Sequence, residues 1–290
     1  MRTTSTLFDP HVHMSSRTTD DYEAMARAGI RAVLEPSSSG GQPRTNAGSF
    51  VDHFASLVGW ERFRASQFGI RHHCALGLSP REANDESLAR DVLDLLPRFL
   101  VKEGVVAVGM IGFEERTSAE EEAFVRQLDI AERARLPVLV HTPRADKKRA
   151  VERTLAILRE MTFAPEMAVI DGCSEETAEQ VLDAGHWAGF SKLGSAQMAA
   201  LALHFGKTRV LIGSAADWSP SDPLTVSKTA DEMRRIGFAP KDVLAFMWQN
   251  PIAFFAQSGR IAADHFEHVE TVDRPAASGV RPLPPFGASP

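Results

Sequence analysis

Short apolar runs alternate with helical segments eight times along this chain of 290 residues. The runs that we predict as strands cover residues 7–13, 30–34, 70–78, 104–112, 137–141, 167–171, 186–190 and 208–214. The run 104–112 shows little polar alternation, as is typical of a parallel strand buried on both faces. Eight strand–helix repeats predict an α/β fold, namely a (β/α)8 TIM barrel. The competing architecture, an open doubly wound sheet, rarely has so many repeats.

Helical patterns separate these runs and follow the last one. They cover residues 20–28, 50–67, 88–102, 118–135, 146–161, 174–184, 197–205, 223–236 and 241–256. Ser118, with Glu121 three residues later, has the pattern of a capping box, and Pro97 predicts a kink or a restart within its helix. From about residue 262 the chain is rich in proline and glycine and loses its periodicity. We therefore predict a barrel domain, residues 1–261, and an irregular or disordered C-terminal tail, residues 262–290.

The composition is ordinary for a globular protein, with 43% hydrophobic and 24% charged residues. The formal net charge of -6 offers no general attraction to nucleic acid or to an anionic membrane. Two distant cysteines, Cys74 and Cys173, make no disulfide framework and suit a reducing compartment. We find neither a signal peptide nor a membrane-spanning stretch. These features predict a cytoplasmic protein without a membrane partner, and they do not specify an oligomeric state.

Two histidines, His11 and His13, close the first apolar run with one residue between them. On a strand their side chains would share one face, because side chains alternate with a period of two. Two imidazoles on one face can bind a single transition-metal ion. Two solvated surface histidines give the same pattern, so the pair gains weight only from the residues that close the later strands.

Three further candidate ligands follow later runs, at the end of the barrel where functional residues gather. His141 closes the apolar run 138–140 and should point to the barrel mouth. Asp217 comes just after the last run, with a turn or helix-capping role as the alternative. Glu114 follows the fourth run, with a solvated loop charge as its alternative. Imidazoles and carboxylates together suit a borderline divalent cation, so we predict a metal site made of His11, His13, Glu114, His141 and Asp217.

Three arginines, Arg44, Arg81 and Arg144, lie in loops at the predicted mouth. Any of them could bind an anionic substrate group such as phosphate, although loop arginines are commonly just solvated. Lys192, at the end of the seventh run, carries the same two interpretations. We predict Arg44, Arg81 and Arg144 as substrate-binding residues.

With these residues collected, the chain resembles the TatD-like metal-dependent hydrolases, within the amidohydrolase-type barrels, over roughly residues 7–257. Residues 8–13, Phe-Asp-Pro-His-Val-His, are similar to the family's opening Asp-x-His-x-His. Residues 136–144 resemble its segment that ends in His-x-x-Arg or His-x-Arg, and Asp217 occupies the place of its last-strand Asp. Residues 250–255 are similar to its closing Asn-x-x-x-x-Phe. The resemblance implies a TIM barrel with metal ligands at His11, His13, His141 and Asp217.

The chain departs from the family pattern at three positions. Met110 falls where the family has its metal-bridging Glu, Gly172 where it has a strand-six His, and Ser79 where it has a third-strand His. Glu114 aligns with the family's following Asp and could replace the missing bridge. These losses should weaken a second metal position most, so the resemblance implies one or two ions.

The function we predict is a metal-dependent hydrolase acting on a phosphoester, ester or amide bond of a small-molecule or phosphoester substrate. A divalent metal would make water reactive near neutral pH, with Zn²⁺ as the first choice for a His-rich site and Mn²⁺ or Mg²⁺ as alternatives. Asp217 would act as the general base. Nucleic acid is an alternative substrate that the acidic composition does not favour. The alternative function is a degenerate TatD-like barrel that binds a small molecule or a partner without hydrolysis.

Overall fold

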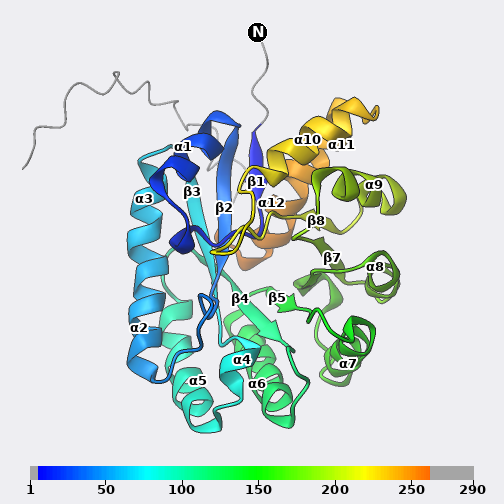
Figure 1. Ribbon diagram of the computed structural model, residues 1–290. Helices are drawn as coiled ribbons and strands as arrows, with labels where there is room; N and C mark the ends of the chain where they lie inside the picture. The colour runs from blue at the N-terminus through cyan, green and yellow to red at the C-terminus, as the bar shows by residue number, and fades with distance from the viewer. Residues whose placement is uncertain (1–5, 262–290) are drawn as a thin grey trace, which may run out of the picture.

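Eight parallel strands form a nearly closed ring with helices outside it in the computed structural model, which describes residues 6–261 (Figure 1). The strands are β1 Leu7–Asp9, β2 Ile30–Pro36, β3 Arg71–Leu76, β4 Val105–Gly112, β5 Val138–His141, β6 Ala168–Asp171, β7 Trp187–Phe190 and β8 Val210–Ile212. Each strand pairs with the next one along the chain. The predicted (β/α)8 barrel is confirmed, and the predicted tail, residues 262–290, lies outside the described residues.

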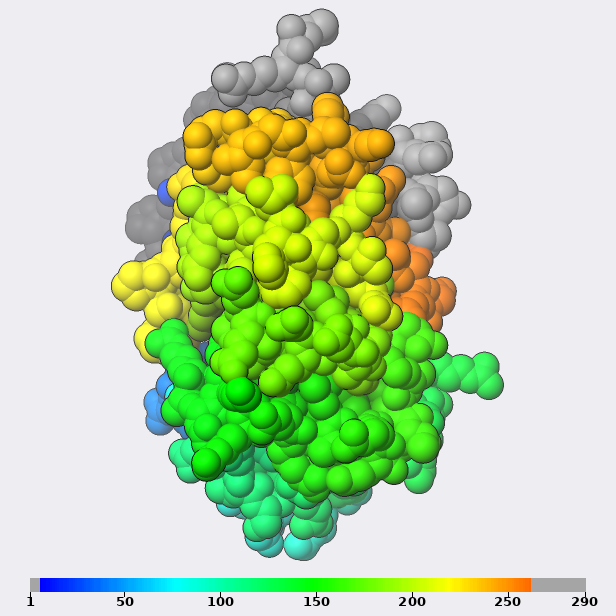
Figure 2. All heavy atoms as spheres, turned by 90° about the vertical axis from the view of Figure 1, so that its right-hand side faces the viewer, coloured from blue at the N-terminus to red at the C-terminus, as the bar shows by residue number. Residues whose placement is uncertain are grey.

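Twelve α-helices are found within residues 6–261, and most of them surround the ring of strands. They are α1 Thr19–Arg27, α2 Ala47–Ala55, α3 Arg62–Ser66, α4 Pro80–Ala83, α5 Glu86–Leu100, α6 Ser118–Ala134, α7 Lys147–Glu160, α8 Glu175–Asp183, α9 Ser195–Phe205, α10 Thr225–Arg235, α11 Pro240–Leu244 and α12 Asn250–Phe255. Helices α7 to α10 follow one another along the side of the barrel seen in Figure 2. No helix between residues 6 and 261 is long and apolar enough to cross a membrane.

Two long helical patterns of the sequence are interrupted by π-helical turns. The predicted helix 50–67 consists of α2, η2 Ser56–Glu61 and α3, and the predicted helix 241–256 consists of α11, η4 Ala245–Gln249 and α12. Three short 3-10 segments complete the described secondary structure: η1 Met14–Ser16, η3 Pro165–Met167 and η5 Ala256–Ser258. Pro97 lies inside α5, which runs on to Leu100 instead of restarting.

The barrel interior is filled by aliphatic and aromatic side chains that alternate with helix-facing residues along the strands. Phe254 and Phe255 of α12 extend this inner cluster. The ring of Phe255 lies 5.8 Å from that of Phe8, and the ring of Phe254 lies 5.4 Å from that of Trp187. Trp187 is the first residue of β7, so α12 packs at the amino ends of the strands. The carboxyl ends of the strands, where barrel enzymes place their active sites, are not covered by α12.

The first strand is shorter than predicted. It ends at Asp9, because Pro10 has no N–H to continue the hydrogen-bonded ladder. His11 and His13 therefore lie in the following loop, not on the strand. The backbone of this loop is held by the segment after β8, since the N–H of Ala215 donates to the carbonyl of His11 at 2.7 Å. A Cβ on Gly213 would lie 2.9 Å from the Cβ of His11, so only glycine permits this approach.

The start of α6 also differs from the predicted capping box. The N-cap is Thr117, whose Oγ1 accepts the N–H of Glu120 at 3.1 Å, and not Ser118. The Glu120 side chain is buried and accepts the N–H groups of residues 114, 115 and 116. Glu121, the expected partner of Ser118, pairs instead with Arg153 on α7. Glu120 thereby fixes the loop that carries Glu114 at the barrel mouth.

Candidate active site

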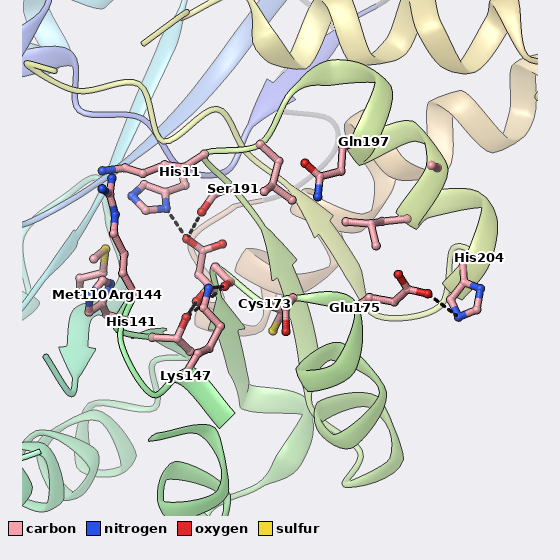
Figure 3. A pocket seen from close by; sticks show the side chains of 18 of the residues that line it. His11, Met110, His141, Arg144, Lys147, Cys173, Glu175, Ser191, Gln197 and His204 are labelled. Atoms are coloured by element: carbon pink, nitrogen blue, oxygen red, sulfur yellow. Dashed lines mark hydrogen bonds and ion pairs between the residues drawn. The ribbon is translucent and has the colours of Figure 1, made fainter. Parts of the chain in front are cut away.

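A cavity of about 560 Å³ opens at the carboxyl ends of the strands (Figure 3). Its inner wall includes His11 and His13 after β1, Asp171 at the end of β6, and Ser191 and Lys192 after β7. His141, Met110, Arg144 and Lys147 line the side towards β4 and β5. The cavity continues outwards between α8 and α9 to Gln197, Glu175 and His204. We call it the active-site pocket.

A carboxylate from β6 orients the first histidine of the pair. Asp171 Oδ2 lies 2.6 Å from His11 Nδ1 and accepts the Ser191 hydroxyl at 2.7 Å (Figure 3). Burial opposes ionisation of Asp171, but His11 and the hydrogen bonds outweigh this effect, so the pKa of Asp171 lies below its usual value. Because the carboxylate is ionised, Nδ1 of His11 donates to it. The Nε2 atom of His11 is then available on the opposite side of the ring.

The two histidines converge through their Nε2 atoms, which lie 3.1 Å apart. Two nitrogens that each bind the same ion at about 2.0–2.1 Å lie about 2.8–3.0 Å apart in octahedral geometry and about 3.3–3.4 Å apart in tetrahedral geometry. The observed distance lies between these values. Burial, assisted by neighbouring His11, lowers the pKa of His13 to about 3. The His13 ring is therefore neutral at physiological pH, as a metal ligand must be. The chemistry and spacing of this pair fit two ligands of one divalent ion.

Asp217, the predicted base, lies near the pair but is bonded elsewhere. Its Oδ2 atom accepts Lys192 Nζ at 2.7 Å, and its Oδ1 atom accepts the N–H of Ser219 at 2.8 Å. Burial opposes ionisation of Asp217, but the hydrogen bonds from Lys192 and Ser219 outweigh it and lower the pKa to about 2. Both oxygens of Asp217 thus already accept hydrogen bonds from protein donors.

His141 and Glu114 are brought together, and they bond to each other. His141 Nε2 lies 2.8 Å from Glu114 Oε2, and Arg81 donates to the other oxygen of Glu114 at 3.1 Å. The hydrogen bond from His141 is the largest of several effects that lower the pKa of Glu114 to about 2. These two predicted ligands therefore form a closed hydrogen-bonded cluster with Arg81 at the edge of the site.

A complete set of metal ligands is not assembled in this arrangement. Within residues 6–261, no group of three or more His, Cys, Asp and Glu side chains is placed to hold a metal ion. His11 and His13 fit as a pair, and any third protein ligand must leave an ion pair. Gly172 cannot supply it, because glycine has no side chain. At its φ of 76° an added Cβ would lie 2.9 Å from Thr142 Oγ1, so a larger residue would be strained there.

The three predicted arginines have different surroundings. Arg144 lines the active-site pocket, whereas Arg44 and Arg81 are not among the residues described as lining it. Arg44 pairs with the buried carboxylate of Glu82 at 3.0 Å and lies over the ring of Phe50. Arg81 pairs with Glu114 as described above. Of the three, Arg144 alone is placed to meet a ligand in this pocket.

Lys147, Asp171 and Ser191 line the pocket although they were not predicted as site residues, and Lys192, for which two interpretations were left open, lines it as well. The signal for Asp171 was present in the sequence, because it is the polar residue that closes the apolar run 167–171. Ser191 and Lys192 likewise follow the seventh run directly. Lys147 gave no such signal, since it lies in the first turn of α7 and reaches the carbonyl of Gly172.

Comparison with known proteins decides the family. The model of the TatD related DNase family matches residues 8–256. The chain belongs to this family. An uncharacterized metal-dependent hydrolase of Methanocaldococcus jannaschii is 27% identical over 256 residues, which cover 86% of this chain and 99% of the relative. The uncharacterized metal-dependent hydrolase YcfH of Escherichia coli is 36% identical over 124 residues, 40% of this chain and 43% of the relative.

A solved structure supports the same assignment. The TatD-like protein of Archaeoglobus fulgidus superposes with a TM-score of 0.72 and 27% identity, covering 86% of this chain and 99% of that chain. The TatD family is a hydrolase family, and its metal-dependent relatives imply a divalent metal without specifying which one. The predicted family and enzyme class are therefore confirmed.

Proposed function

We propose that this TatD protein hydrolyses a phosphoester, ester or amide bond of a small molecule within the active-site pocket. The observation that carries the proposal is the 3.1 Å approach of the His11 and His13 Nε2 atoms beside the ionised Asp171. A buried imidazole pair backed by a carboxylate is the arrangement that catalytic metal sites use to fix ligand orientation. The pocket reaches this pair from outside, so a substrate can approach it.

The proposed metal ligands are His11, His13 and Asp217, with His141 and Glu114 joining only if their mutual ion pair opens. Zn²⁺ is the first choice because the ligands are rich in imidazole, and Mn²⁺ or Mg²⁺ are the alternatives. When bound, such an ion polarises the scissile group and makes water reactive near neutral pH. Met110 and Gly172 favour one ion over two, since neither side chain can ligate a hard cation.

The side chains around His11 and His13 have separate proposed roles. Asp171 holds His11 in one orientation and one tautomer through the 2.6 Å hydrogen bond. Asp217 receives the proton of the attacking water as general base. With its pKa near 2 it is a weak base while Lys192 is bonded to it, so we propose that Lys192 turns to an anionic substrate oxygen and thereby restores the basicity of Asp217.

Arg144 is the proposed substrate-binding arginine. Its guanidinium lines the pocket, and within residues 6–261 no ion pair or hydrogen bond engages it. Arg44 and Arg81 are committed to Glu82 and Glu114, so a direct role for them requires those pairs to break. We also propose a cytoplasmic location, supported by the free, buried state of Cys74 and Cys173.

A substrate panel tests the proposal. Protein loaded with Zn²⁺, Mn²⁺ or Mg²⁺ is assayed on bis(p-nitrophenyl) phosphate, p-nitrophenyl phosphate, p-nitrophenyl acetate, a p-nitroanilide and a short oligonucleotide. We expect metal-dependent turnover of at least one substrate, which a chelator and the double variant His11→Ala/His13→Ala abolish. Turnover that survives in a folded double variant would refute the site. Ligand binding with no turnover of any substrate would support the alternative, a non-hydrolytic binding protein.

A further inference from the structure

A second cavity, of about 610 Å³, lies between the segment after β7 and the segment after β8. Its lining includes Ser195 at the start of α9, Ser219 and Lys228. It shares Arg144, Lys192 and Leu193 with the active-site pocket, so the two cavities adjoin. The segment after β8 and the start of α9 both contribute residues to its lining.

We propose that this second cavity binds a phosphate group carried by the substrate, away from the bond that is hydrolysed. The inference rests on the proposed function, because it treats the adjoining pocket as the reaction centre. It defines the substrate class as small molecules with two parts, a hydrolysable bond and a phosphate.

The charge of the lining favours an anion. Arg144, Lys192 and Lys228 contribute three cationic side chains, and Asp222 is the single carboxylate among the lining residues described. Lys228 pairs with Asp222 at 2.5 Å, and Lys192 pairs with Asp217 at 2.7 Å. Arg144 has no ion pair within the described chain. A planar guanidinium can bond two phosphate oxygens at once, which adds both strength and geometric specificity.

The start of α9 adds hydrogen-bond donors. The N-cap is Gly194, which has no side chain to cap the helix, so the N–H groups of the first turn have no side-chain acceptor at the N-cap. The hydroxyl of Ser195 makes no hydrogen bond within residues 6–261. The hydroxyls of Ser219 and Ser221, by contrast, already donate to protein oxygens. The free donors and the positive end of the helix dipole thus face the same cavity as the cations.

The location supports the same conclusion. Barrel enzymes often bind phosphate with the loops that follow strands seven and eight and with a nearby helix N-terminus. In this chain the two loops are residues 191–194 and 213–224, and both line the cavity. Because Arg144 and Lys192 border both cavities, one molecule can place its phosphate here and its reactive bond beside His11 and His13.

Binding of inorganic phosphate to the metal-loaded protein, measured by titration calorimetry, tests the proposal. We expect Lys228→Ala and Ser195→Pro each to weaken binding about tenfold, the usual effect of losing one charged hydrogen bond. Proline is tolerated at the first position of a helix, and Gly194, with ψ of 149°, already has the conformation that precedes proline. Lys207→Ala is the matched control, since Lys207 is 53% exposed and pairs with Asp242, whereas Lys228 is 57% exposed and pairs with Asp222.

The variant His11→Ala/His13→Ala separates this inference from the proposed function. Phosphate binding that persists in the double variant and falls in Lys228→Ala supports the second cavity, whether or not a hydrolysed bond has been found. Binding that is lost in the double variant and unchanged in Lys228→Ala would assign phosphate to the reaction centre and overturn the proposal. No binding at 10 mM phosphate, as an order-of-magnitude limit for a useful subsite, would also overturn it.

Discussion

The two sides of the barrel mouth use the same residue types in opposite ways. Near β1 and β6, His11 and His13 turn their Nε2 atoms towards one point, with Asp171 bonded behind them. Near β4 and β5, His141 turns its Nε2 atom onto Glu114 at 2.8 Å. On the first side the two Nε2 atoms are therefore placed to bind an ion and the side is open. On the second side the imidazole and the carboxylate bond to each other and the side is closed. We call them the open side and the closed side.

The difference lies in which ring nitrogen of the histidine each carboxylate bonds. Asp171 bonds the Nδ1 atom of His11, so that Nε2 faces the Nε2 atom of His13, while Glu114 bonds the Nε2 atom of His141. Glu114 is presented to His141 by the loop that Glu120 holds. We therefore expect a histidine of the family motif to act as a ligand only where its carboxylate partner bonds the other ring nitrogen.

The largest effect is expected from removing the open side. His11→Ala/His13→Ala should lose stoichiometric metal, since both ligands that converge on the proposed ion are removed. His141→Ala should retain metal, with affinity lowered by about 10–100-fold at most, as for a residue that supports a site without anchoring it. Metal content by mass spectrometry and affinity by calorimetry measure both. Equal metal loss in the two variants would erase the distinction between the sides.

The next effect separates the buried arginine from the exposed one. Arg44→Ala leaves the buried Glu82 without its cation, and breaking a buried pair costs about 3–5 kcal/mol. Arg81→Ala removes a side chain that is 53% exposed, so about 0–1 kcal/mol is expected. Urea unfolding of both variants gives the free energies. Similar losses of unfolding free energy would contradict the expectation that the buried ion pair stabilises the fold more than the exposed one.

A smaller effect is expected from the carboxylate behind His11. Asp171→Asn keeps the shape of the side chain but removes its charge, so His11 loses its fixed tautomer. We expect metal affinity or activity to fall by about 10–100-fold, the usual range for such supporting residues. Glu114→Gln is the matched substitution on the closed side, and it should have a weaker effect on metal affinity. The reverse order would place the ion on the closed side.

The pH dependence of the free energy of unfolding tests the interactions of Asp217. Its folded pKa of about 2 lies below its usual value of 3.8, so the ionised form stabilises the fold above pH 4 and this contribution disappears as the pH falls towards 2. The difference corresponds to about 2 kcal/mol. Asp217→Asn should therefore be less stable at neutral pH and should lose less stability between pH 5 and pH 2, measured by urea unfolding. An identical acid transition in both proteins would contradict the bond from Lys192.

Sequence patterns were sufficient for the barrel because each strand–helix repeat carries its own local signal. The pattern also placed His11, His13 and His141 at the mouth, where the structure has them. Pro10 was a local signal for the early end of β1 that the interpretation of residues 7–13 as one strand passed over. The contact with Gly213 that holds the following loop could not be predicted, because it joins distant parts of the chain. Nor could the sequence pattern show that Glu114 bonds His141 or that Lys192 bonds Asp217, since the geometry between strands selects these partners.

We propose that the metal binds on the open side of the mouth, and anomalous diffraction from zinc-loaded crystals can locate it. We expect a peak at about 2.0–2.1 Å from the Nε2 atoms of both His11 and His13, with Asp171 still bonded to Nδ1 of His11. A peak bound by His141 and Glu114 instead, with the His11–His13 contact unchanged and no ion beside it, would refute this assignment.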